Sequence, residues 1–216
     1  NVLVEKPITL NSPDAKILNE IALERNLVLM VGHLLLFHPA ILKIKEYIDN
    51  GKLGKLQYIY SNRLNLGTVR TEENILWSFA PHDISVIQFF TGDAPEEVKA
   101  TGAVFLQKNI QDTTLTILKF KNNIHAHIYV SWLHPFKEQR LVVIGDKSMM
   151  MFEDTLRENK LKFYPKGIDI VEGLPVKRDL EFENIEFEST SPLELEQRHF
   201  IECIENNTVP RADGYN

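Results

Sequence analysis

Residues 113–132 read TTLTILKFKNNIHAHIYVSW, and this stretch decides the class of fold. Hydrophobic and β-branched residues alternate with polar ones on both sides of Asn122-Asn123, a dipeptide typical of tight turns. The flanking segments, 113–120 and 124–132, are therefore predicted to be neighbouring strands joined in a hairpin-like arrangement.

Further strand-like segments surround this pair. In residues 56–66, Tyr58, Tyr60 and Asn62 would share one face of a strand, and Ile59, Ser61 and Arg63 the other. Shorter candidates are 98–106, 139–144, 149–152, 161–164 and 180–187. Consecutive strands with short turns predict an α+β fold with a large, mostly antiparallel sheet and helices on one face. The other face then needs a partner, and we expect a homodimer or homotetramer formed through it.

The first 32 residues follow a different pattern. Residues 2–4 and 27–31 have the apolar character of buried parallel strands, and Ser12-Pro13-Asp14 predicts a helix between them with Ser12 as its N-cap. We therefore expect residues 1–32 to be the C-terminal remnant of a Rossmann domain, and residues 33–216 to form an α+β substrate-binding and oligomerisation domain. The sequence has no Gly-x-Gly-x-x-Gly motif and no initiator Met, so we expect a fragment of a longer protein.

Composition excludes several classes of partner. The net charge is −6 and no basic stripe is present, which argues against binding to nucleic acid. No apolar run approaches the roughly 18 residues of a membrane span, so no membrane partner is expected. The single cysteine, Cys203, permits no internal disulfide, is expected in the core, and favours a cytoplasmic location.

Residues 75–84, ILWSFAPHDI, place a His-Asp pair inside an apolar segment. A helix beginning near Asn74 would kink at Pro81, which has no N–H to donate. A helix beginning at Pro81 would instead put His82 and Asp83 in its first turn. There the helix dipole favours an anionic Asp83 and a neutral His82, which is a proton acceptor. Either helix would end at Gly92.

Several short motifs follow one another along the chain. They are Val4-Glu5-Lys6-Pro7, Val31-Gly32-His33, Gly51-Lys52-Leu53-Gly54, Pro81-His82-Asp83, Ser191-Pro192-Leu193, residues 200–204 and residues 210–214. This ordered set resembles the Gfo/Idh/MocA oxidoreductases over nearly the whole chain. Residues 77–83 and 131–137 are similar to those of members acting on nucleotide sugars, such as the UDP-N-acetylglucosaminuronate 3-dehydrogenases.

The resemblance implies an NAD(P)-dependent dehydrogenase acting on a CH–OH group of a sugar or nucleotide sugar. In such enzymes the lysine of Glu-Lys-Pro lies beside the nicotinamide, and the Lys-Pro peptide is often cis. It therefore implies that Lys6 and His82 are catalytic and that Glu5, Lys6 and Pro7 contact NAD or NADP. Many members carry an aspartate four residues before the histidine. Here that residue is Ser78, which leaves Lys6 and His82 as the acid–base pair.

Candidate substrate-binding residues lie on the strand and loop that lead to His82. A sugar diphosphate requires donors of the arginine type, and the candidates are Arg63, Asn65, Arg70, Asn74 and Asp83. His125 and His127 alternate on one strand face, but no third ligand accompanies them, so no metal site is predicted.

A second class of function is open to the same family. Relatives without catalysis act as sugar sensors or as assembly modules built on the exposed sheet. The presence of both Lys6 and His82 favours catalysis, because a sensor needs neither. Without most of its cofactor domain, the fragment alone is expected to be inactive.

Overall fold

The computed structural model describes residues 1–215, which form two compact units. Unit 1 comprises residues 1–42 and 188–216, of which residue 216 is not described, and unit 2 comprises residues 43–187. Each unit is described by itself. The division at residues 32 and 33 expected for a cofactor domain stays a prediction.

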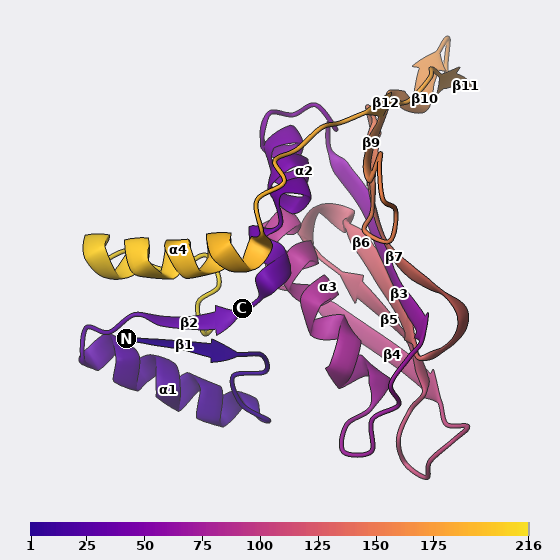
Figure 1. Cartoon of the computed structure of the whole chain (residues 1–216). Helices are drawn as coiled ribbons and strands as arrows, with labels where there is room; N and C mark the ends of the chain where they lie inside the picture. Colours follow the sequence, from indigo (N-terminus) through magenta and orange to yellow (C-terminus); the bar gives the residue numbers. More distant parts are fainter. Residues whose placement is uncertain (216) are drawn as a thin grey trace. The chain divides into compact units, whose positions relative to one another are not determined.

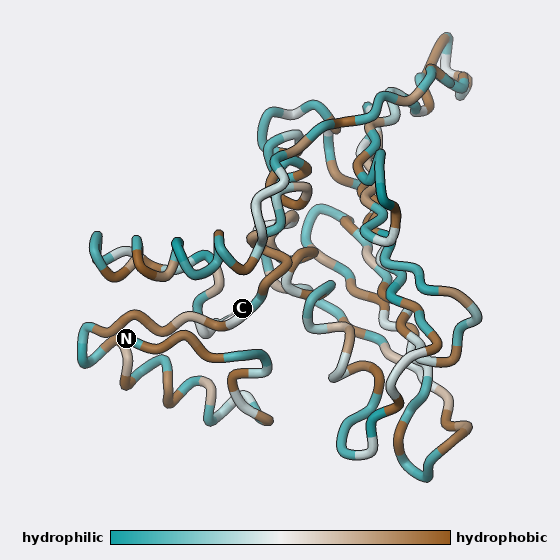
Figure 2. The backbone as a smooth tube through the Cα atoms, in the orientation of Figure 1, coloured by the Kyte–Doolittle hydropathy of each residue, from teal (hydrophilic) through white to brown (hydrophobic). Residues whose placement is uncertain are grey.

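Unit 1 is built on two parallel strands. Strand β1 (Val2–Glu5) pairs with β2 (Leu29–Gly32), helix α1 (Ser12–Glu24) connects them, and Glu5 lies opposite Gly32. Figure 2 shows both strands as mainly hydrophobic segments. The N-cap of α1 is Asn11 rather than Ser12, because the Asn11 side chain accepts a hydrogen bond from the Asp14 amide at 2.9 Å.

The C-terminal segment belongs to the same unit. Helix α4 (Pro192–Asn206) packs against the short 3-10 helix η1 (Leu34–Phe37), as Figure 1 shows. Beyond α4, the amide of Val31 in β2 donates to the carbonyl of Ala212 at 2.9 Å. Cys203 is 1% exposed, which confirms its expected place in the core.

Unit 2 contains an eight-stranded mixed sheet in the order β12-β9-β8-β7-β3-β6-β5-β4. Its strands are β3 (Leu56–Leu66), β4 (Glu97–Ala103), β5 (Thr113–Lys119), β6 (His125–Ser131), β7 (Leu133–Gly145), β8 (Met149–Glu153), β9 (Leu161–Tyr164) and β12 (Glu183–Asn184). Strands β3 and β6 run parallel, and the other neighbouring pairs are antiparallel. The expected large, mostly antiparallel sheet is confirmed.

Residues 113–132, from which the class of fold was predicted, form the expected hairpin. Strands β5 and β6 pair antiparallel from Thr113 opposite Ser131 to Lys119 opposite His125. The turn η2 (Lys121–Asn123) reverses the chain, with φ of 58° at Asn122 and 60° at Asn123. Asparagine tolerates this left-handed conformation better than most residues, which explains why the dipeptide signals the turn.

Two parts of the sheet differ from expectation. The strand predicted over 180–187 is wrong, since only Glu183–Asn184 pairs with β9. Residues 166–179, for which no strand was predicted, form a separate hairpin of β10 (Lys166–Val171) and β11 (Leu174–Asp179). Its turn contains Glu172 and Gly173, both with positive φ, and this Glu-Gly pair was the overlooked signal.

Helices cover one face of the sheet. Helix α3 (Ile75–Thr91) packs on β3, β5 and β6, where Ile59, Ala126 and Ile128 are at most 1% exposed (Figure 1). Helix α2 (Pro39–Asp49) precedes β3. None of the helices in the described part of the chain is long and apolar enough to cross a membrane.

Helix α3 settles the choice between the two helix starts. Its N-cap is Asn74, Pro81 lies inside it, and Gly92 ends it with φ of 71°. The helix beginning at Pro81 is wrong, so His82 and Asp83 do not feel the dipole of a first turn.

Candidate active site

The carboxyl end of β1 carries the Glu5-Lys6-Pro7 segment. The Lys6–Pro7 peptide is cis, as the family resemblance implied. Glu5 lies so close to β2 that a Cβ added at Gly32 would come within 3.3 Å of the Glu5 Oε2 atom. A glycine at position 32 therefore lets the Glu5 carboxylate rest against the neighbouring strand.

Two buried polar side chains accompany this segment in unit 1. His33 is 8% exposed and Glu196 is 3% exposed. The His33 Nδ1 and Glu196 Oε1 atoms have no hydrogen-bond partner among residues 1–215. Burial, assisted by the charge of Lys6, lowers the pKa of His33. Burial, assisted by the charge of Glu5, raises the pKa of Glu196 to about 7. Both side chains are thus driven toward their neutral forms.

These residues fit a polar ligand such as a nicotinamide nucleotide. In open α/β sheets, ligands bind at the carboxyl ends of parallel strands, where Lys6 and His33 lie. Buried polar atoms without partners are uncommon, and a ligand with donors and acceptors would satisfy them. The contact of Glu5, Lys6 and Pro7 with such a cofactor stays a prediction.

A buried ion pair joins β3 to α3 in unit 2. The Asp83 carboxylate is 4% exposed. The Arg63 guanidinium donates to its Oδ2 from Nε at 2.9 Å and to its Oδ1 from Nη2 at 3.0 Å. The Ser61 hydroxyl donates to the same Oδ1 at 2.7 Å. Burial lowers the pKa of Arg63, but the charge and hydrogen bonds of Asp83 outweigh it and raise that pKa.

Arg63 and Asp83, two of the predicted substrate-binding residues, bind each other in this ion pair. The Arg63 side chain is 15% exposed, so the pair is largely withdrawn from solvent. It anchors α3 to the sheet one residue beyond His82, which is half-buried on the same helix. Their roles in binding substrate stay predictions, whereas their mutual contact gives them a structural role.

The remaining substrate candidates lie nearby in the chain but have different surroundings. The Asn74 side chain caps α3, accepting from the Trp77 amide at 3.1 Å and donating to Gln111 Oε1 at 3.2 Å. Asn65 is half-buried near the end of β3. Arg70 is exposed in the loop and lies 3.9 Å from Glu73.

Sequence reasoning missed two polar clusters in unit 2. Asp112 is fully buried and accepts from the Trp132 indole at 2.6 Å and from the amides of Phe105 and Leu106. These donors outweigh burial and lower its pKa. Arg140 bonds to Glu153 at 3.0 Å and lies 3.5 Å from Glu138, which also accepts from Asn62. Residues of each cluster come from distant parts of the sequence, so no local sequence pattern predicted either cluster.

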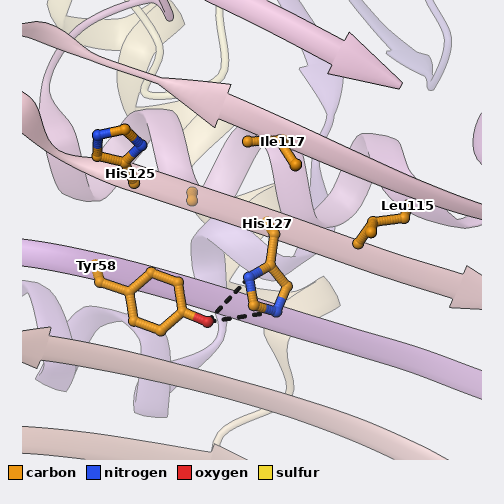
Figure 3. Close-up of a pocket in the computed structure, with 6 residues that line it drawn as sticks. Tyr58, Leu115, Ile117, His125 and His127 are labelled. Carbon is orange, nitrogen blue, oxygen red and sulfur yellow. Dashed lines mark hydrogen bonds between the residues drawn. The ribbon is translucent and has the colours of Figure 1, made fainter. Parts of the chain in front are cut away.

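The other face of the sheet bears an open pocket of about 240 Å³. Figure 3 shows His127 beside Tyr58, whose hydroxyl lies 2.9 Å from the His127 Nδ1, with Leu115, Ile117 and His125 around them. Tyr60 stacks on His127 at 5.4 Å between ring centroids. Burial lowers the pKa of His127. Within residues 1–215 no group of three or more His, Cys, Asp or Glu side chains is placed to hold a metal ion.

Along the chain, a β-α-β unit with Lys6-Pro7 directly after its first strand precedes a mixed sheet that helices cover on one face. This combination defines a class of protein. Residues 41–151 match the model of the GFO/IDH/MocA C-terminal domain, which is half of the chain. The chain belongs to this family, as the ordered motifs predicted.

Named relatives agree with this assignment. UDP-N-acetylglucosamine 3-dehydrogenase from Acidithiobacillus ferrooxidans is 26% identical over 213 residues, which cover 98% of this chain and 65% of that protein. The scyllo-inositol 2-dehydrogenase (NAD(+)) from Bacillus subtilis is 25% identical over 97% of this chain and 62% of its own length. The chain therefore spans somewhat less than two thirds of these relatives.

The structural comparison gives the same result. The solved structure of UDP-N-acetylglucosamine 3-dehydrogenase GnnA from Acidithiobacillus ferrooxidans has a TM-score of 0.82 and 25% identity. The similarity covers 99% of this chain and 65% of that chain. The α+β fold with helices on one face of a large sheet is thereby confirmed.

Proposed function

We propose that this chain supplies the substrate domain and part of the cofactor edge of an NAD(P)-dependent dehydrogenase that oxidises a hydroxyl of a sugar or nucleotide sugar. The observation that carries the proposal is the placement of Lys6 at the carboxyl end of parallel strand β1. The match over nearly the whole chain to a relative named for UDP-N-acetylglucosamine supports the substrate class. The single buried cysteine is in keeping with a cytoplasmic enzyme.

The proposed reaction divides between two side chains. His82 accepts the proton of the sugar hydroxyl as general base. The ammonium of Lys6 orients the hydroxyl oxygen and stabilises the negative charge that develops on it. A nicotinamide nucleotide, which Glu5, Lys6 and Pro7 would hold, would supply the acceptor for the hydride of the carbon that bears this hydroxyl. The Arg63–Asp83 pair fixes the helix from which His82 projects.

Substitution of the two side chains tests this proposal. In the full-length protein with NAD⁺ and UDP-N-acetylglucosamine, His82→Asn should lower kcat by about 10²–10⁴-fold, the usual contribution of a general base. Lys6→Met should lower kcat with little change in folding, followed by circular dichroism. Gln88→Asn, on the same helix as His82, is the control. Rates of both site variants within about threefold of wild type would remove His82 and Lys6 from the mechanism.

We also propose that the enzyme is a homodimer or homotetramer assembled through the open face of the sheet. Leu115, Ile117 and Tyr129 are 37%, 44% and 36% exposed there, beside the pocket of Figure 3. Contiguous exposed apolar side chains of this kind mark association surfaces. Ile117→Asp should reduce the sedimentation coefficient toward that of the monomer; a wild-type monomer at high concentration would contradict the proposal.

A further inference from the structure

The loop between β4 and β5, residues 104–112, contains a polar cluster that the proposed reaction does not use. Its apolar side chains contribute little to holding it in place, since Val104, Phe105 and Leu106 are 43%, 67% and 54% exposed. Asp112, at the end of the loop, is fully buried, and its Oδ2 atom accepts from the amides of Phe105 and Leu106 at 2.6 and 2.9 Å. Hydrogen bonds to a buried carboxylate therefore fix the conformation of this loop.

Asp112 also joins the loop to the sheet. Its Oδ1 atom accepts from the Trp132 indole at 2.6 Å. Its backbone carbonyl accepts from the Trp132 amide and from the Ser131 hydroxyl, each at 3.3 Å. Trp132 is fully buried between β6 and β7. The loop thus begins and ends on the sheet and is held at a fixed point by one residue.

A tight turn in this loop presents the side chain of Gln107. The amide of Ile110 donates to the Gln107 carbonyl at 3.2 Å, and Asn109 between them has φ of 68°. The Gln107 side chain donates from Nε2 to the backbone carbonyl of Arg70 at 2.8 Å. This hydrogen bond holds the backbone of the loop 67–74, while the Arg70 side chain stays 58% exposed and accessible to a ligand.

A second glutamine holds the end of the same loop, where α3 begins. The Gln111 Oε1 atom accepts from the Asn74 side chain at 3.2 Å, and the Gln111 carbonyl accepts from the Ile75 amide at 3.0 Å. Arg70 and Asn74, two of the predicted substrate-binding residues, are therefore both held by residues 104–112. The contacts to Arg70 and Asn74 come from side chains, so substitutions can remove them one at a time.

We propose that Gln107, held in place by the Asp112 cluster, is a positioning residue that sets Arg70 for binding the diphosphate of a nucleotide sugar. The proposal rests on the proposed function, since that function assigns a nucleotide sugar to this site. Arginine binds phosphate oxygens through a planar fork of donors, so the place of its backbone matters. A loop that is ordered before the substrate arrives also lowers the cost of binding. Substrate affinity, rather than the rate of proton transfer, should therefore depend on Gln107.

Gln107→Met in the full-length protein tests this role, because methionine is unbranched and flexible and has no hydrogen to donate. The KM for UDP-N-acetylglucosamine should rise about threefold to tenfold, the usual effect of one hydrogen bond, while kcat stays within about twofold of wild type. Lys108→Met, an exposed change in the same turn, is the control and should keep the wild-type KM. An unchanged KM in Gln107→Met, or an equal rise in Lys108→Met, would overturn the proposal.

Hydrogen exchange gives a readout that needs neither substrate nor cofactor. A peptide covering residues 66–76 should exchange faster in Gln107→Met than in wild type, and Lys108→Met should match wild type. Unchanged exchange in Gln107→Met would overturn the positioning role. Faster exchange in Gln107→Met, in a protein whose wild type has no activity toward any nucleotide sugar, would instead refute the proposed function and leave the hold of Gln107 on the loop supported.

Discussion

Two buried carboxylates, Asp83 on α3 and Glu196 on α4, are exposed to nearly the same small extent, 4% and 3%, but have opposite surroundings. Asp83 accepts three hydrogen bonds, from Ser61 and from the two nitrogens of Arg63. Glu196 has a buried oxygen without a hydrogen-bond partner among residues 1–215, and the charge of the Glu5 carboxylate acts on it. Burial alone therefore does not decide what an acidic residue does. The carboxylate of Asp83 fixes the structure through its contacts with Arg63 and Ser61, whereas burial and the charge of Glu5 raise the pKa of Glu196 to about 7.

The largest expected effect comes from breaking the pair. Asp83→Asn leaves the Arg63 guanidinium buried without a counter-ion, and the free energy of unfolding should fall by about 3–5 kcal/mol. Urea denaturation followed by tryptophan fluorescence measures this change. The double variant Arg63→Met/Asp83→Leu should recover most of the loss, because it removes both charges. A loss below about 1 kcal/mol in Asp83→Asn would show that the pair does not hold α3 on the sheet.

The second effect concerns the unpaired carboxylate and depends on pH. The pKa of Glu196 rises on folding from 4.5 to about 7. Its contribution to stability is complete below pH 4.5 and disappears as the pH rises through 7. Relative to wild type, Glu196→Gln should therefore gain on the order of 2 kcal/mol between pH 5 and pH 9, measured by denaturation at both pH values. A difference between the two proteins that does not vary with pH would contradict the assignment.

The smallest effect is expected from an exposed carboxylate on the same helix. Glu194 pairs with Arg198 at 2.7 Å, but both side chains are more than half exposed. Solvent screens such pairs, and Glu194→Gln should change the free energy of unfolding by about 0.5 kcal/mol or less. Thermal denaturation at low and high salt would measure it. A loss of unfolding free energy comparable to that of Asp83→Asn would mean that solvent exposure does not explain the difference between Glu194 and Asp83.

Much of the architecture was predictable from local patterns. The turn at Asn122-Asn123, the alternation along 56–66 and the end of α3 at Gly92 depend on neighbours in sequence. The N-cap of α1 was predicted at Ser12 and lies at Asn11, because the two residues are adjacent and both are good N-cap residues. The roles of Lys6 and His82 in catalysis came from ordered motifs and stay predictions.

Pairing between strands was harder to foresee. Strand β3 lies between β6 and β7 and is parallel to β6, which no local turn could reveal. Strand β7 begins at Leu133, before the segment predicted from 139, although Pro135 lies within it. The proline is accommodated at a register shift between Leu64 and Leu66 of β3, where a ladder hydrogen bond is not required.

The sequence by itself determined most of the elements, the large sheet with one covered face, and the family. These depend on periodicity, on turn residues and on the order of short motifs, all of which are local along the chain. Only the tertiary structure decided that Asp83 is paired with Arg63 and that the Glu196 Oε1 atom is buried without a partner among residues 1–215. The physical reason is that the surroundings of a buried group depend on hydration and on neighbours in space, and both are set only when the chain folds.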